Sequence, residues 1–379
     1  MGLTIFGLPQ IKEEMMIDEP DVLSAFREQL AIGIARHDGI PRFEPLETTP
    51  WIAMSVLQKS VRRGRTGLAL QAAATLQLDA PDKLWRRCGG IAFEDVGVAD
   101  LDVVGMATAG LAGKRARAAL GGEWSVASFI VEVMAGAPKC RTTDDLLMSV
   151  ELHPGLAGPR RNLPAFSNDQ LRRFILGTGS LQERATALWY LLGTDRRPSK
   201  HLAMRRGEPA LAFDVLDELG APLTAVALAR EGFRRTREVL CPFAALLLVD
   251  DERPSGPAED DALPPETMIG SVPAWALDQY TREGRIAFGR FLRTGCRAAR
   301  RLCSLVPAGR RLDALGSLVF SAEGGLLTRR IRWPLGDELR RRFDTECHGI
   351  DASAAVELLD LLKADIPVLN RVRAEVMGG

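Results

Sequence analysis

The sequence of 379 residues predicts an almost wholly α-helical protein made of multi-helical bundle domains. Apolar residues recur at the 3.6-residue period of a helix through most of the chain. Helix start and stop signals, such as Thr, Asp or Pro before a segment and Gly after it, bound many of these periodic segments. A strand pattern with a turn is confined to residues 317–333, where Glu323-Gly324-Gly325 predicts one small hairpin.

Composition indicates an ordinary globular chain with an unusual choice of cation. The length allows two or three domains, and 46% hydrophobic with 26% charged residues is typical of soluble proteins. The formal net charge is zero, so total charge indicates no class of partner. Of the 49 cations, 42 are Arg and 7 are Lys. A GC-rich genome explains this bias, and so does phosphate recognition, because the guanidinium group offers a bidentate fork that lysine lacks.

Cysteine, histidine and hydropathy patterns predict a cytoplasmic protein without metal or cofactor. The six cysteines form no C-x-x-C pair and the four histidines lie far apart, which argues against a zinc site or a disulfide framework. The first ten residues lack the basic and apolar regions of a signal peptide. The longest apolar run, Cys241–Val249, is about half the length of a membrane span. It predicts a buried helix or a short strand.

The N-terminal region, residues 1–49, is expected to form an arm with one helix over Glu19–Arg36. Pro20 lies in the first turn of that segment, where the missing N–H is tolerated. Glu44–Pro50 has the Pro and Thr content of a linker. We expect the arm to pack on the following domain or on a neighbouring copy of the chain.

The stretch Trp51–Asp100 predicts a series of helices. Trp51–Arg63 is amphipathic and ends in cations followed by Gly64, a normal helix end. Thr66–Leu78 is rich in alanine and leucine, and a break with Pro81 separates it from a third helix over Lys83–Phe93. Further helices are expected as far as residue 153.

Three motifs in residues 50–153 form the most specific pattern of the chain. The first is Lys59-Ser60-Val61-Arg62, with Gly64 displaced by an extra Arg63. The second is Arg86-Arg87 leading to Phe93-Glu94-Asp95-Val96-Gly97-Val98-Ala99-Asp100, and the third is Ala137-Pro138-Lys139-Cys140. In these motifs the region resembles the helical C-terminal region of the replication-associated recombination-factor AAA+ ATPases of the RarA/MgsA type, which are relatives of clamp loaders.

The resemblance implies that residues 50–153 form a clamp-loader-collar-like domain that assembles into a homo-oligomer and acts in DNA replication and recombination. It implies structural roles for Lys59, Ser60, Arg62, Gly64, Arg86, Arg87, Glu94, Asp95, Gly97 and Asp100. Glu94 and Asp95 are expected to form buried pairs with Arg62, Arg86 or Arg87. Asp100 is expected to cap a helix.

The sequence departs from these ATPases before the collar-like region, where only about 50 residues stand. No G-x-x-x-x-G-K-[ST] motif occurs in the sequence. The segment most similar to this motif, Gly110–Arg115, lacks the first glycine at the required spacing and has Arg115 in place of the magnesium-binding hydroxyl. No ATPase activity and no catalytic residue are therefore expected. A metal-dependent enzyme that uses Glu94, Asp95 and Asp100 is the alternative chemical interpretation.

The second half of the chain is predicted to hold two more helical regions and a linker. Prolines and glycines after residue 153 mark a boundary, and residues 154–249 predict a second helical domain. Residues 250–271 are acidic and rich in proline, which predicts a flexible linker. This linker is either merely solvated or competes with nucleic acid for the basic region after it.

Residues 272–379 predict a basic C-terminal helical domain. One amphipathic helix is expected over Arg282–Cys303, with Phe291 and Leu302 on its apolar side. Its other side carries a candidate nucleic-acid-binding set: Arg290, Arg293, Arg297 and Arg301, with Arg300 at the edge. Such a set is either a binding face for an anionic partner or a plain solvated face. The final helix, from Ala352, is expected to be kinked or broken at Pro367.

Two functional hypotheses follow. The first is a non-catalytic DNA-maintenance assembly protein that oligomerises, binds nucleic acid through arginine-rich faces and works with a separate ATPase or repair protein. The alternative is a helical adaptor or scaffold that binds a protein partner and no nucleic acid. Neither hypothesis requires a membrane.

Overall fold

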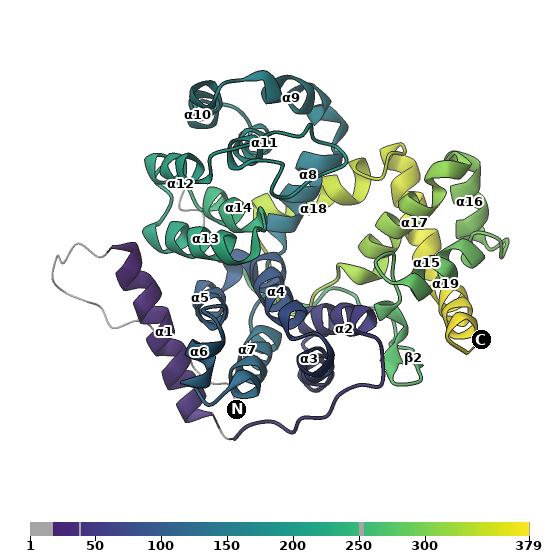
Figure 1. Ribbon diagram of the computed structural model, residues 1–379. Coiled ribbons are helices and arrows are strands. Elements are labelled where there is room, and N and C mark those ends of the chain that lie inside the picture. The colour runs from purple at the N-terminus through teal and green to yellow at the C-terminus, as the bar shows by residue number, and fades with distance from the viewer. Residues whose placement is uncertain (1–17, 38, 250–253, 379) are drawn as a thin grey trace.

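The computed structural model describes residues 18–37, 39–249 and 254–378. Within these residues the fold is all-α apart from two small antiparallel sheets of two strands each, which confirms the predicted fold class (Figure 1). No helix in this part of the chain combines the length and the apolar character needed to cross a membrane.

The three motifs lie in the part of the chain that forms helices α1 to α8. The described part of the chain begins at α1, whose N-cap Asp18 forms a reciprocal capping box with Asp21. A π-helical turn (Ala92–Val96) and a 3-10 turn (Gly97–Ala99) connect α4 to α5. The helices are α1 (Glu19–Arg36), α2 (Pro50–Arg62), α3 (Thr66–Asp79), α4 (Pro81–Ile91), α5 (Leu101–Gly110), α6 (Lys114–Ala118), α7 (Glu123–Gly136) and α8 (Thr142–Leu152).

Six further helices form the upper part of the molecule in Figure 1. Helices α10 and α11 both begin at serine capping boxes, which satisfy backbone N–H groups of their first turns. The apolar run after Cys241 is the buried helix α14. The helices are α9 (Ala157–Asn162), α10 (Asn168–Leu176), α11 (Leu181–Leu192), α12 (Pro209–Glu218), α13 (Leu223–Thr236) and α14 (Leu240–Leu247).

The C-terminal region contains five helices and the four strands of the described chain. Strand β1 pairs with β4, and β2 pairs with β3 through a tight turn. The strands are β1 (Ala258–Glu259), β2 (Met268–Ile269), β3 (Val272–Pro273) and β4 (Arg330–Ile331). The helices are α15 (Arg282–Phe291), α16 (Arg297–Leu305), α17 (Arg311–Val319), α18 (Pro334–Glu346) and α19 (Ala352–Gly378).

Two hydrophobic cores hold these helices together. The larger core runs without interruption from α1 through α14 and also takes in Trp275, Trp333 and Leu339. It spans the expected arm and both expected helical domains, 50–153 and 154–249, because α1 packs on α5 and α13 while α8 packs on α11 and α14. The smaller core lies among α15, α16, α17 and α19. Helix α18 packs on both α8 and α19 and so links the two cores (Figure 1).

Intramolecular packing covers much of the apolar surface of residues 50–153, the region for which the motif resemblance implies self-association. Helix α3 is rich in alanine and leucine, and α2, α4 and α7 pack on it. Self-association through residues 50–153 stays a prediction that no surface feature of the described region yet supports.

The structure corrects the predicted hairpin over 317–333. Ser317 lies in α17 and residues Phe320–Gly324 form a π-helical turn, so only Arg330–Ile331 is a strand. Its partner is the distant strand β1, not the preceding residues. The side chains around Glu323-Gly324-Gly325 are buried against α2, and this tertiary contact outweighs the local turn signal.

The C-terminal helices also differ from the expected ones. The single helix expected over Arg282–Cys303 is two helices, α15 and α16, because the chain turns at Gly295, which adopts a left-handed φ of 70°. Conversely, α19 continues past Pro367 to Gly378, and this proline is exposed.

The acidic segment 250–271 is held against the body of the protein from Pro254 onward. Asp261 binds Arg330 at 2.5 Å, and its backbone pairs with Leu327. Glu266 binds Arg65 at 2.9 Å. These contacts hold a sequence that has few apolar groups of its own, since Asp261 and Glu266 each bind an arginine from another part of the chain.

We expect Phe291→Ala to destabilise the protein by about 3–5 kcal/mol, because Phe291 is fully buried in the smaller core. The matched control is Ile286→Ala on the same helix, where the side chain is 40% exposed and the expected change is within about 0.5 kcal/mol. Urea unfolding of both variants measures the two free energies. Equal effects would contradict the assignment of this core.

Candidate functional site

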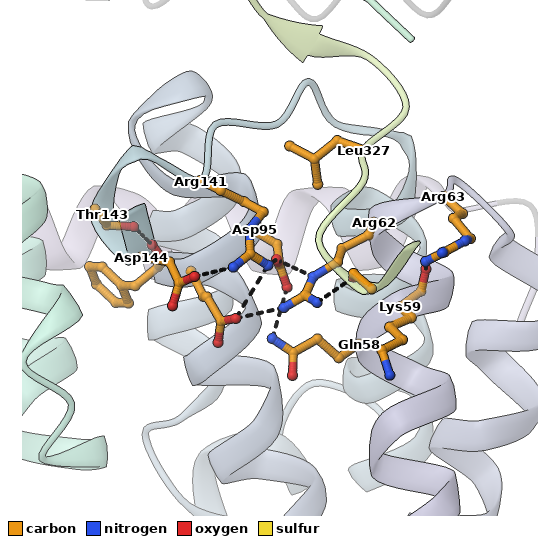
Figure 2. A network of polar contacts seen from close by, with 12 residues as sticks. Gln58, Lys59, Arg62, Arg63, Asp95, Arg141, Thr143, Asp144 and Leu327 are labelled. Carbon is orange, nitrogen blue, oxygen red and sulfur yellow. Dashed lines mark hydrogen bonds and ion pairs between the residues drawn. The ribbon is translucent and has the colours of Figure 1, made fainter. Parts of the chain in front are cut away.

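A buried ionic network joins the three sequence motifs (Figure 2). The Arg62 guanidinium group donates from Nε to Asp95 Oδ1 at 2.6 Å and from Nη2 to Glu94 Oε1 at 2.6 Å. Arg141, next to the third motif, donates to the same Asp95 oxygen at 3.0 Å and also binds Asp144. The Arg62, Asp95 and Arg141 side chains are at most 3% exposed, so water contributes little to their solvation.

Gln58 and Arg87 extend this network toward the surface. Gln58 donates to the second Asp95 oxygen at 3.1 Å, and Arg87 donates to the Gln58 carbonyl oxygen at 2.8 Å. Burial opposes the ionisation of Glu94, but Arg62 and Arg141 outweigh it and hold the pKa of Glu94 below its ordinary value. Burial raises the pKa of the neighbouring Asp95, although Arg62 and Arg141 oppose this shift. Through these ion pairs Glu94 and Asp95 connect α2, the π-helical turn and the start of α8.

The C-terminal end of α2 binds the C-terminal region of the chain. Arg62 donates from Nη1 to the Gly324 carbonyl at 2.8 Å, and Arg63 donates to the Glu323 carbonyl at 2.7 Å. Lys59 pairs with Asp278 and donates to the Trp275 carbonyl at 2.9 Å. Burial lowers the pKa of Lys59 to about 8, although Asp278 opposes this shift. The first motif thus positions the turns before α15 and after α17.

The backbone conformation explains why glycine occupies two of the motif positions. Gly97 has a φ of 55°, and a Cβ atom there would lie 2.3 Å from the Cys140 carbonyl oxygen. Only glycine permits this close approach of the second and third motifs. Gly64 has a φ of 63° directly after α2, as a helix C-terminus favours.

The remaining motif residues divide between the interior and the surface. Asp100 accepts from the Val103 backbone N–H at 3.0 Å and caps α5. Ser60 is fully buried within α2. Arg86 is exposed and takes no part in the network, so of the three arginines expected to pair with Glu94 and Asp95, Arg62 makes the direct contact.

A cleft with a volume of about 610 Å³ lies beside the network. Its walls come from α2, α4 and α8, and from residues 278–280, α17 and α18 of the C-terminal region. Both signs of charge line it, together with the aromatic side chains Trp51 and Tyr280. Sequence reasoning missed this cleft, because residues near positions 55, 85, 150 and 280 come together only in the folded chain.

The candidate nucleic-acid-binding arginines lie at the turn between α15 and α16. Arg290 ends α15, Arg293 lies in the turn, and Arg297 and Arg300 lie in the first turn of α16; all four are exposed. Arg301 differs, because it donates to both carboxylate oxygens of Glu357 of α19, from Nε to Oε1 at 3.1 Å and from Nη2 to Oε2 at 2.8 Å. The set is therefore not one helical stripe but a corner of the molecule.

No family model matches this chain, and no curated protein and no solved structure matches it either. The resemblance to the RarA/MgsA-type collar region therefore stays a prediction from the three motifs.

We expect Arg62→Leu to cost about 3–5 kcal/mol of stability, because it leaves the buried Asp95 and Glu94 without their main partner. Arg86→Leu, an exposed arginine on α4 outside the network, is the matched control and should change stability by less than about 0.5 kcal/mol. Chemical denaturation of the two variants tests this. Similar stabilities of the two variants would show that the network is not what holds the motifs together.

A buried histidine near the cleft predicts a pH dependence. His348 accepts or donates a hydrogen bond at 2.8 Å with Ser317, a cleft residue, and is 6% exposed. Burial lowers the pKa of His348 to about 4, because the imidazolium form loses its hydration. The folded state therefore binds a proton at His348 less readily than the unfolded state does.

The stability that neutral His348 contributes is complete above its ordinary pKa of 6.5 and is lost as the pH falls toward about 4. Within this window the loss approaches about 1.4 kcal/mol per pH unit. His348→Gln should flatten the fall in melting temperature over this range. His201→Gln, which changes an exposed histidine, should keep the wild-type slope. Parallel slopes for all three proteins would contradict the prediction.

Proposed function

We propose that this protein is a non-catalytic nucleic-acid-binding protein that contacts the phosphate backbone through Arg290, Arg293, Arg297 and Arg300. The observation that carries the proposal is that these four arginines are exposed and none has a carboxylate within ion-pair distance among the described residues. A DNA-maintenance role, as the motif resemblance implies, is the setting that we propose for this binding.

Other arginines of the C-terminal region differ from these four. Arg301, Arg330 and Arg340 each bind a carboxylate, and so do Arg332, Arg341, Arg342 and Arg373. Such pairing is not general in residues 272–379, because Arg282, Arg285, Arg310, Arg311, Arg329 and Arg371 also lack a carboxylate within ion-pair distance among the described residues. The four exposed arginines at the α15–α16 turn lie near one another without carboxylate partners, so their charges repel one another at low salt. An anionic partner would relieve that repulsion.

The position of Arg297 adds a second argument. It is the first residue of α16, where the helix dipole presents partial positive charge and disfavours a cation. Asp365 caps this terminus by accepting from the Ala298 backbone N–H at 2.8 Å. Because the Asp365 carboxylate opposes a second anion at this terminus, the flanking guanidinium groups provide the attraction for a phosphate.

Binding of this kind is expected to be indifferent to sequence, because phosphate contacts carry no base information. It should also weaken steeply as salt rises, since each neutralised phosphate releases condensed counterions. Self-association through residues 50–153 and cooperation with a separate ATPase belong to the same proposal and rest on the motif resemblance alone.

Changing Arg290, Arg293, Arg297 and Arg300 to Gln should abolish or strongly weaken binding to a fluorescent DNA duplex of mixed sequence. If all four contact phosphates, the slope of log K against log salt should fall in magnitude by up to about 3.6, at about 0.9 per contact. Fluorescence anisotropy between about 50 and 200 mM salt measures both quantities.

The matched control changes Arg234, Arg235, Arg341 and Arg342 to Gln, which removes the same charge from arginines paired with Glu231 and Glu338. Binding should survive in this control. If the wild-type protein does not bind at low salt, or if both variants bind as it does, the four arginines are a solvated face. The adaptor function, with a protein partner, would then be favoured.

A further inference from the structure

One face of α4 forms a basic wall of the cleft described above. Lys83, Arg86, Arg87 and Gly90 all line the cleft, and their spacing of three, four and seven residues places them on one side of a helix. A Cβ atom at Gly90 would meet nothing within 4 Å, so this position leaves open space beside the three cations. A ligand can therefore approach the helix backbone closely there.

The three cations of this wall have no carboxylate partner within ion-pair distance in the described structure. Lys83 lies over the Trp51 ring, 4.4 Å from its centroid. Arg87 donates to the neutral Gln58 side chain, and Arg86 makes only a 3.4 Å contact with the Asp82 carbonyl. Elsewhere around the cleft, by contrast, Lys59 pairs with Asp278 and Arg197 pairs with Glu238. Positive charge available to a ligand is thus concentrated on α4.

Two exposed aromatic side chains accompany this charge. Trp51, at the start of α2, is 60% exposed although Lys83 lies over its ring, and Tyr280 is 71% exposed. Large aromatic side chains are normally buried or used in recognition, because their apolar rings gain free energy when water is removed from them. Cations that follow a backbone and rings that stack with bases are the combination that binds single-stranded nucleic acid.

We propose that this cleft holds one or two nucleotides of a single-stranded nucleic acid, with a phosphate on Lys83 and Arg86 and a base stacked on Trp51 or Tyr280. The volume of about 610 Å³ lies in the range of sites that enclose a small molecule, and is too small for a duplex. Carboxylates such as Glu151 also line the cleft. They repel negative charge, so they disfavour a ligand that is anionic over its whole surface and direct the phosphates of a bound strand toward α4. This site is separate from the arginine corner of α15 and α16.

The test uses the full-length protein and a thymidine trinucleotide with a 5′ phosphate, measured by isothermal titration calorimetry at low salt. Lys83→Gln with Arg86→Gln should weaken binding at least about tenfold, because two phosphate contacts are lost. The control is Lys114→Gln with Arg115→Gln, the same change of charge on α6, at exposed residues outside the cleft. It should bind as the wild type does.

Stacking is tested by Trp51→Ala and by Trp51→Phe. A stacked base makes Trp51→Ala at least about fivefold weaker, while Trp51→Phe retains most of the affinity because a ring is still present. Trp51 is exposed, so circular dichroism should show unchanged helix content in both variants. If Trp51→Ala and Lys83→Gln with Arg86→Gln both bind like the wild type, or if the wild type does not bind at millimolar trinucleotide, the proposal is overturned.

Two more measurements separate this site from its alternatives. The variant with Arg290, Arg293, Arg297 and Arg300 changed to Gln should keep trinucleotide binding while it loses duplex binding. Loss of trinucleotide binding in that variant alone would place the ligand on the arginine corner and refute the cleft site. Thymidine monophosphate should bind more weakly than the trinucleotide; equal affinity would show a site for a free nucleotide and not for a strand.

Discussion

The structure depends on a buried guanidinium group, Arg62, at the C-terminal end of α2. It binds Glu94 and Asp95 on one side and the Gly324 carbonyl on the other, and so connects residues from three distant parts of the sequence. Burying these charges is costly, and the network offsets that cost because Gln58 satisfies the other oxygen of Asp95 and Arg141 donates to the oxygen that Arg62 binds. These hydrogen bonds and ion pairs form only when α2, the π-helical turn and the segment around Gly324 hold this relative arrangement. They fix where the C-terminal region lies on α2, and with it the shape of the cleft.

The two basic surfaces of the molecule differ in physical character. The arginines at the α15–α16 corner are exposed and project from a turn, so they suit a long, flat polyanion that need not enter the protein. The cations of α4 line a hollow that also contains aromatic rings. A hollow of limited volume selects for size and for unpaired bases, whereas an open corner selects only for charge. If both proposals hold, one chain combines a general contact with a selective one.

Helix positions were largely predictable from the sequence because they are set locally. Glu19–Arg36 coincides with the predicted segment, since its proline and apolar spacing act within a few turns. The motif resemblance implied that Glu94 and Asp95 pair with Arg62, Arg86 or Arg87, and of these three Arg62 makes the direct contact. The break near Gly295 and the loss of the predicted hairpin were not predictable, because packing on other elements decided them. The cleft was invisible for the same reason: its walls are far apart in the sequence.

The contact between Arg62 and Gly324 joins residues 262 positions apart. During synthesis residues 50–153 therefore emerge long before the segment that covers the end of α2. Until then Lys59, Arg62 and Arg63 lack the carbonyl and carboxylate groups at positions 275–324 that they bind in the finished fold. Closing so long a loop is slow. A nascent or truncated chain would expose a cationic helix end and the unfilled side of the larger core, and would be a natural substrate for a chaperone.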